Sequence, residues 1–313
     1  MNFTKMHGLG NDFILIDCRE QAFSVQHSAF SDLSKRLCHR RFGIGADQLL
    51  LLYPSNIADF KMRIFNADGC EVEMCGNGIR CLAKYIWDRN LSDKNILHIE
   101  TLAGIIRAEK VGDMVKVDMG KPIFEPEKIP VNISQESLVN SQQSNPPSPP
   151  FTKGGHEGIN DQCPMTNDQL ANSSPIVDYP LQVKDREFLI TCVSMGNPHA
   201  IIVVNNISDF PVTYYGPMIE NHPIFPKRTN VEFIKILNPS EITMRVWERG
   251  SGETMACGTG ASAAAVASNI KGLTGKNVTV HLLGGDLFIE WSDENYVYMT
   301  GPATEVFEGT IES

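Results

Sequence analysis

The stretch MRIFNADGCEVEMCGNGIR, residues 62–80, recurs in altered form as MRVWERGSGETMACGTGAS, residues 244–262. Six of the 19 aligned positions are identical, and the strongest identity is a Cys-Gly-x-Gly motif that begins at Cys75 in one copy and at Cys257 in the other. Self-similarity at a fixed distance is typical of a repeated architecture. We therefore expect two homologous halves, each with a strand, a Cys-Gly-x-Gly loop and a helix.

The repeat extends upstream, where Gly10-Asn11 corresponds to Gly196-Asn197 and each pair precedes an apolar strand. Apolar periodicity and turn residues predict the other elements. Expected strands cover 13–16, 48–53, 61–65, 96–101, 104–109, 114–118, 181–193, 200–205, 230–236, 242–247, 278–283, 286–291 and 296–300. Expected helices cover 31–38, 79–87 and 259–269. Two such halves facing each other would place the two thiols on opposite sides of one cleft.

Residues 134–174 interrupt this pattern. They are rich in Ser, Asn, Gln, Pro and Gly and poor in aliphatic side chains. A segment of this composition cannot bury enough apolar surface to offset the entropy that ordering costs. We therefore predict a disordered surface insertion.

The bulk composition describes a globular protein of one large domain or two ordinary ones. The 313 residues are 42% hydrophobic and 20% charged, and the net charge is −10. Such a charge repels phosphate backbones, which disfavours nucleic-acid binding. No stretch approaches the roughly 20 apolar residues that span a membrane. The N-terminal MNFTKMHGLGND lacks the pattern of a secretory signal, so we expect a cytoplasmic protein whose eight cysteines are free thiols.

The paired motifs point to a specific chemistry. A thiol at a helix start lies beside unpaired N–H groups and the positive end of the helix dipole, which can lower the thiol pKa. Inversion at an amino-acid α-carbon needs a base on one face and an acid on the other. Cys75 and Cys257, related by the repeat, satisfy this requirement without a cofactor.

Three other interpretations are weaker. A redox pair would place its cysteines close in sequence, whereas Cys75 and Cys257 belong to different halves. Zinc binding by Cys70, Cys75 and Cys81 lacks regular spacing and a nearby histidine cluster, so we predict no metal. Residues 258–263 formally match a dinucleotide-binding fingerprint, but no βαβ succession surrounds them.

Eight motifs resemble the diaminopimelate epimerases, and they span residues 1 to about 309 except for the insertion. They are MHGLGNDF (6–13), GADQ (45–48), FNADG (65–69), MCGNGIR (74–80), GNPH (196–199), RTNV (228–231), WERG (247–250) and ACGTG (256–260). The resemblance implies an α/β (α+β) fold of two pseudo-symmetric lobes, each a curled sheet around a central helix. The expected lobes are 1–120 with about 302–313, and 121–301.

The resemblance also implies a reaction, the interconversion of LL- and meso-2,6-diaminoheptanedioate. Cys75 and Cys257 are then the acid/base pair, while His199 and Glu248 keep the thiols in their working protonation states. The implied substrate-binding residues are Asn11, Gln48, Asn66, Gly76, Asn77, Asn197, Asn230, Glu248, Arg249, Gly258 and Thr259. Arginine suits a carboxylate of this double zwitterion, and neutral amides can serve its carboxylates or ammonium groups.

Two questions stay open at this level. Family members often carry a tyrosine near the C-terminus that helps to hold a homodimer, and Phe307 occupies that position here. The closest rival activity is a proline or hydroxyproline racemase of the same fold, against which the Asn residues and Arg249 argue. A rival of another class is a noncatalytic amino-acid-binding protein, which has no need of two thiols at helix starts.

Overall fold

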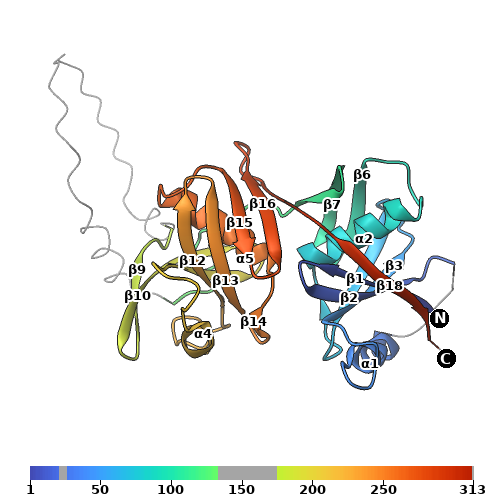
Figure 1. The fold of residues 1–313 in the computed structure, drawn as a ribbon, viewed down its shortest axis with the longest axis horizontal. Coiled ribbons are helices and arrows are strands. Elements are labelled where there is room, and N and C mark those ends of the chain that lie inside the picture. The colour runs from blue at the N-terminus through green and yellow to red at the C-terminus, as the bar shows by residue number, and fades with distance from the viewer. Residues whose placement is uncertain (21–26, 133–174, 312–313) are drawn as a thin grey trace, which may run out of the picture.

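The computed structural model describes residues 1–20, 27–132 and 175–311, and most of them belong to a mixed α+β arrangement dominated by strands (Figure 1). The predicted insertion at 134–174 lies entirely outside these residues. The described part contains no helix that is both long and apolar enough to cross a membrane.

The first half of the chain runs from β1 to β8. Its strands are β1 (Asn2–Gly8), β2 (Asn11–Asp17), β3 (Gln48–Tyr53), β4 (Phe60–Asn66), β5 (Glu71–Val72), β6 (Ile96–Thr101), β7 (Gly104–Val111) and β8 (Met114–Asp118). Its helices are α1 (His27–Cys38), between β2 and β3, and α2 (Gly76–Asp88), between β5 and β6.

The second half repeats this order. Its strands are β9 (Tyr179–Val183), β10 (Arg186–Ser194), β11 (Pro198–Val203), β12 (Asn230–Asn238), β13 (Glu241–Glu248), β14 (Gly252–Thr254), β15 (Asn277–Leu282), β16 (Gly285–Trp291), β17 (Val297–Gly301) and β18 (Thr304–Thr310). Its helices are α4 (Val212–Glu220), between β11 and β12, and α5 (Gly258–Ile270), between β14 and β15.

Strand pairing shows the pseudo-symmetry directly. One series of neighbours is β18-β1-β2-β3-β4-β6-β7-β8, with parallel pairs β2–β3 and β4–β6. The other is β9-β10-β11-β12-β13-β15-β16-β17, with parallel pairs β11–β12 and β13–β15. The two series join where β8 pairs with β17, Val117 opposite Met299. Figure 1 shows the halves side by side, with β18 returning to the first one. The exact lobe limits stay a proposal.

Each half wraps its sheet around one helix. Helix α5 is buried from Gly258 to Ser268 except at Thr259, and its alanines let strands approach it from several sides. Helix α2 buries larger residues such as Ile79, Leu82 and Ile86 against the first sheet. A helix that is apolar all round, such as α5, must be covered all round, whereas α2 leaves Lys84 and Asp88 outside the core.

Some elements escaped the sequence analysis. Strand β1 carries polar residues that obscure its alternation, and β18 is exposed over much of its length. Helix α4 contains Gly216 and Pro217, which weaken a helical pattern. The stretch 181–193 is divided into β9 and β10 at Lys184, whose φ of 53° marks a turn.

Candidate active site

Both motif cysteines stand at the start of the central helix of their half. Cys75 and Cys257 are the N-cap residues of α2 and α5, with extended backbones of φ −140° and −122°. The Gly260 backbone N–H donates to Sγ of Cys257 at 3.4 Å, whereas the Cys75 side chain makes no cap hydrogen bond, although the backbone N–H groups of Gly78 and Asn77 lower its pKa. The repeat thus gives each thiol the same place at a helix start.

The two helix starts contact each other. Nδ2 of Asn77 donates to the carbonyl oxygen of Ala256 at 3.2 Å, which links the two loops directly. A Cβ on Gly258 would lie 2.8 Å from Sδ of Met299, and a Cβ on Gly76 would lie 2.9 Å from Cε of the same side chain. The Met299 side chain therefore packs closely against the first glycine of both helices. The charge of Glu248 raises the pKa of both thiols.

On the Cys257 side, polar groups form a chain. Oγ1 of Thr259 lies 3.5 Å from Sγ of Cys257 and accepts from Nδ2 of Asn197 at 3.3 Å. Oδ1 of Asn197 lies 2.9 Å from Nε2 of His199, and Nδ1 of His199 lies 2.7 Å from Oε1 of Glu232. His199 lies on β11 and Glu232 on β12, while Asn197 precedes β11 and Cys257 and Thr259 stand at the start of α5.

On the Cys75 side, the neighbours are amides and a buried cation. Oδ1 of Asn11 lies 3.8 Å from the Cys75 thiol and accepts from Nδ2 of Asn77 at 3.2 Å. Nδ2 of Asn11 donates to Oδ2 of Asp47 at 2.9 Å, which fixes the orientation of the Asn11 amide. Nη1 of the fully buried Arg80 donates to Oδ1 of Asn77 at 2.8 Å.

The expected lowering of the thiol pKa is wrong for this ligand-free structure. Burial raises the pKa of Cys75 to about 11, against smaller opposite effects of backbone N–H groups and Arg80. Burial also raises the pKa of Cys257 well above its ordinary value, and the carboxylates of Glu248 and Glu232 raise it further. Loss of water outweighs the helix start because a thiolate is much better solvated than a thiol.

The other predicted binding residues fall into two groups. Gln48 and Asn66 form a pair, with Nε2 of Gln48 donating to Oδ1 of Asn66 at 2.8 Å, and Oε1 of Gln48 has no partner within the described residues. The Asn230 side chain is hydrogen-bonded to backbone groups at both ends, since Nδ2 donates to the Pro198 carbonyl oxygen and Oδ1 accepts from the N–H of Arg249. The exposed Arg249 guanidinium donates to the Lys227 carbonyl oxygen at 3.1 Å.

Three residues with clear roles in this network were not singled out from the sequence. Asp47 and Arg80 stand within recognised motifs, but only the structure shows that they hold Asn11 and Asn77. Glu232 carried a signal of its own, because it is a carboxylate within the otherwise apolar start of β12 (NVEFI). The matching strand β3 reads QLLLL and contains no charge.

The pKa of Glu248, whose charge acts on both thiols, is itself changed by its surroundings. Burial raises the pKa of Glu248, while hydrogen bonds from Thr254 and Cys257 lower it. Glu248 is thus held close to the thiols with its pKa above the ordinary value for glutamate. Between residues 1 and 311, outside the gaps at 21–26 and 133–174, no group of three or more His, Cys, Asp or Glu side chains is arranged to hold a metal ion.

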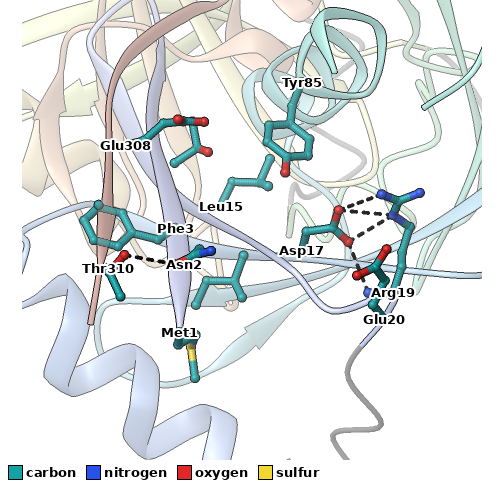
Figure 2. Close-up of a pocket in the computed structure, with 13 residues that line it drawn as sticks. Met1, Asn2, Phe3, Leu15, Asp17, Arg19, Glu20, Tyr85, Glu308 and Thr310 are labelled. Carbon is teal, nitrogen blue, oxygen red and sulfur yellow. Dashed lines mark hydrogen bonds and ion pairs between the residues drawn. The ribbon is translucent and has the colours of Figure 1, made fainter. Parts of the chain in front are cut away.

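A cavity of about 600 Å³ opens elsewhere on the first half, and Figure 2 shows the residues around it. Its walls come from β1, β2, α2 and β18, and they include Phe3, Tyr85 and the bidentate ion pair of Asp17 with Arg19. No predicted site residue lines it. The cavity is therefore separate from the paired thiols.

Comparison with known proteins gives a consistent family. The sequence pattern described as "Diaminopimelate epimerase" matches residues 3–125 and 191–306. A diaminopimelate epimerase from Acetivibrio thermocellus is 46% identical over 318 residues, covering 100% of this chain and 99% of that protein.

Two solved structures share the fold at low sequence identity. One, of a phenazine biosynthesis protein of the PhzF family from Bacillus anthracis, has a TM-score of 0.64 at 17% identity and covers 100% of this chain and 99% of that one. The other, of a probable proline racemase from Agrobacterium radiobacter, has a TM-score of 0.65 at 13% identity and covers 99% and 92%. The match to the family pattern, together with 46% identity over almost the full length of both proteins, shows that this chain belongs to the diaminopimelate epimerase family.

Proposed function

We propose that this protein is a cofactor-independent epimerase that interconverts LL- and meso-2,6-diaminoheptanedioate in the cytoplasm, a step toward lysine and peptidoglycan precursors. The observation that carries the proposal is the contact between two helix starts, each capped by a cysteine, with Glu248 acting on both thiols. The chain also shares 46% of its residues with a full-length relative named for this activity.

The reaction requires one thiolate and one thiol. A thiolate on one side removes the α-proton of the bound substrate, and the thiol on the other side delivers its proton to the opposite face. The first cysteine leaves this turnover as the thiol and the second as the thiolate, so the reverse reaction uses the same groups with exchanged roles. The number of protons on the pair is unchanged.

Negative charge develops on the α-carbon and its carboxylate during proton transfer. The N-terminal N–H groups of α2 and α5 are directed at the site, and they can hold that carboxylate without reorganisation. Both helices begin with glycine, so the backbone can approach the substrate closely. The substrate also excludes water from the thiols, which strengthens every electrostatic interaction around them.

The second amino-acid group of the substrate needs its own partners. We assign this role to the amides Asn11, Gln48, Asn66 and Asn197 together with Arg249. The unpartnered Oε1 of Gln48 is a buried acceptor suited to an ammonium group. Asn230 would act mainly by positioning the backbone of Arg249. Among the described residues the Arg249 guanidinium donates to one backbone carbonyl, so it can turn to a carboxylate.

A proton-exchange assay tests the proposal. The protein, kept reduced, is incubated with LL-diaminopimelate in D2O, and we expect deuterium at the α-carbon together with the meso product. Proline and hydroxyproline are assayed in parallel, because the shared fold does not separate these substrates. Exchange on proline but not on diaminopimelate would select the rival racemase, and binding without exchange would select a noncatalytic binding protein.

Cysteine variants test the two-base assignment. Cys75→Ala and Cys257→Ala each remove one of the two proton-transfer groups, so we expect each to abolish epimerisation. Cys70→Ala is the matched control, since Cys70 is exposed and lies outside the site. Near-normal turnover in either of the first two variants would contradict the assignment.

The homodimer is a further part of the proposal. Phe307 on β18 is 46% exposed and packs edge-on against Phe3 with ring centroids 5.9 Å apart, so an apolar face remains for a second copy. We expect Phe307→Ala to weaken self-association at least tenfold, measured by sedimentation. A protein that is monomeric at every concentration before substitution would rule out this contact.

A further inference from the structure

His199 and Glu232 form a buried acid–base pair beneath the Cys257 helix start. His199 and Glu232 expose none of their surface, and Nδ1 of His199 lies 2.7 Å from Oε1 of Glu232. Oε2 of Glu232 has no hydrogen-bond partner in the described part of the chain. A buried carboxylate that lacks part of its hydrogen bonding is costly, so its presence calls for a function.

The first half of the molecule has no such pair at the equivalent place. In the parallel registers, Phe13 pairs with Gln48 as His199 pairs with Asn230, and Leu15 pairs with Leu50 as Ile201 pairs with Glu232. Phe13 and Leu50 thus occupy the positions of His199 and Glu232. A Cβ on Gly78 would meet Leu50 at 3.2 Å, whereas a Cβ on Gly260 would meet Oε1 of Glu232 at 2.7 Å.

Hydrogen-bond geometry indicates the charge state of His199. Both ring nitrogens face oxygen atoms, Oε1 of Glu232 and Oδ1 of Asn197. As the Asn197 amide lies in the structure, Nδ2 faces Oγ1 of Thr259 and Oδ1 faces His199. With the Glu232 carboxylate as the acceptor on the other side, this arrangement requires His199 to donate from both ring nitrogens.

This arrangement directs the hydroxyl of Thr259. Oγ1 of Thr259 already accepts from Asn197, so its own hydrogen is free to point toward Sγ of Cys257 at 3.5 Å. A hydroxyl that donates to sulfur stabilises the thiolate. If His199 were neutral with its proton on Nδ1, Nε2 would repel Oδ1 of Asn197, the amide would turn over, and the Thr259 hydrogen would be drawn away from the thiol.

We propose that Glu232 is a positioning residue that keeps His199 doubly protonated and thereby aligns Asn197 and Thr259 to donate a hydrogen bond to Cys257. Only the catalytic consequence rests on the proposed epimerase function. The other ionisable groups that face Glu232 are Cys192 on β10, Glu248 on β13 and Cys257 at the start of α5. None of them is a cation, so His199 is the partner that can balance the carboxylate.

The test observes His199 without any substrate. In a protein with ¹⁵N-labelled histidine, we expect the His199 ring to show two protonated nitrogens at about pH 8, where a free imidazole is neutral. The His199→Gln variant identifies the signal. In Glu232→Gln, which keeps the shape but removes the charge, we expect the His199 ring to become neutral. Glu253→Gln is the matched control, because Glu253 pairs with Arg245 instead of with His199, Asn197 or Thr259.

Kinetics supply the second readout. Glu232→Gln should lower kcat about 10- to 100-fold, the effect of losing one charged hydrogen bond, and leave KM within about twofold. A neutral His199 in the unmodified protein would overturn the proposal, as would a His199 ring that stays doubly protonated in Glu232→Gln. An unchanged kcat would overturn the catalytic consequence. Failure of the epimerase function itself would appear as absent α-deuteration in the unmodified protein, and it would leave the spectroscopic result intact.

Discussion

At the scale of single residues, the two thiols have unequal surroundings although their backbones match. At Cys75 burial raises the thiol pKa most, the charge of Glu248 raises it further, and the buried cation Arg80 lowers it by a smaller amount. Around Cys257 lie the carboxylates of Glu248 and Glu232, which raise its pKa. The symmetry of the sequence motif is thus not a symmetry of charge.

This difference predicts which thiol ionises first. As the pH rises in the absence of substrate, Cys75, with a pKa of about 11, should form its thiolate before Cys257. Because the thiolate is the nucleophile, alkylation by iodoacetamide should label Cys75 faster than Cys257 across about pH 8–10. Peptide mass spectrometry measures both rates in one sample, and faster labelling of Cys257 would contradict the assignment.

At the scale of elements, the start of α5 depends on Gly260. Alanine is favoured over glycine within a helix by about 1 kcal/mol. Here a Cβ would lie 2.7 Å from Oε1 of Glu232 and 3.3 Å from Sγ of Cys257, two buried atoms with fixed partners. The contact therefore reverses the usual preference.

We expect Gly260→Ala to lower the free energy of unfolding by about 1–3 kcal/mol, the typical cost of overpacking, and to reduce activity sharply. Gly275→Ala is the control, since the nearest atom to its Cβ would be Pro239 O at 3.7 Å, an ordinary contact. Urea unfolding of both variants checks the difference. Equal stability of Gly260→Ala and the unmodified protein would show that Glu232 can move aside.

At the scale of the whole molecule, buried thiols link stability to pH. Burial raises the pKa of Cys18 to about 11 and that of Cys81 to about 12. In the unfolded chain a cysteine has a pKa of about 8.5. Between these values the folded protein binds more protons than the unfolded chain, so stability falls as the pH rises from about 8.5 toward the folded pKa.

We therefore expect the free energy of unfolding to decrease steadily between about pH 8.5 and 11 in urea titrations. Cys81→Ala should make this decrease shallower, because one of the raised groups is removed. Ile79→Val is the control on the same helix, and it should lower stability equally at every pH. Identical slopes for Cys81→Ala and the unmodified protein would show that Cys81 does not titrate in this way.

Much of the fold could be predicted from local pattern. The expected helix at 79–87 lies within α2, the expected helix at 259–269 lies within α5, and the core strands fall close to their predicted limits. In these elements the apolar residues recur clearly with the period of a strand or of a helix. Strands β1 and β18 were missed because their positions depend on each other: Asn2 pairs with Thr310, at the far end of the chain. No local pattern carries that pairing.

Part of the candidate site could likewise be predicted from local sequence, and part depended on the tertiary structure. The sequence by itself determined the two halves, the Cys-Gly-x-Gly loops and the helices that follow them, because a repeated motif encodes repeated local structure. Tertiary structure alone decided how each thiol is solvated, and it reversed the expected direction of the pKa shift through burial. It also brought Glu232 beneath Cys257 and buried the Arg80 guanidinium completely. Electrostatic surroundings depend on which strands fold over a group, and those strands are distant in the chain.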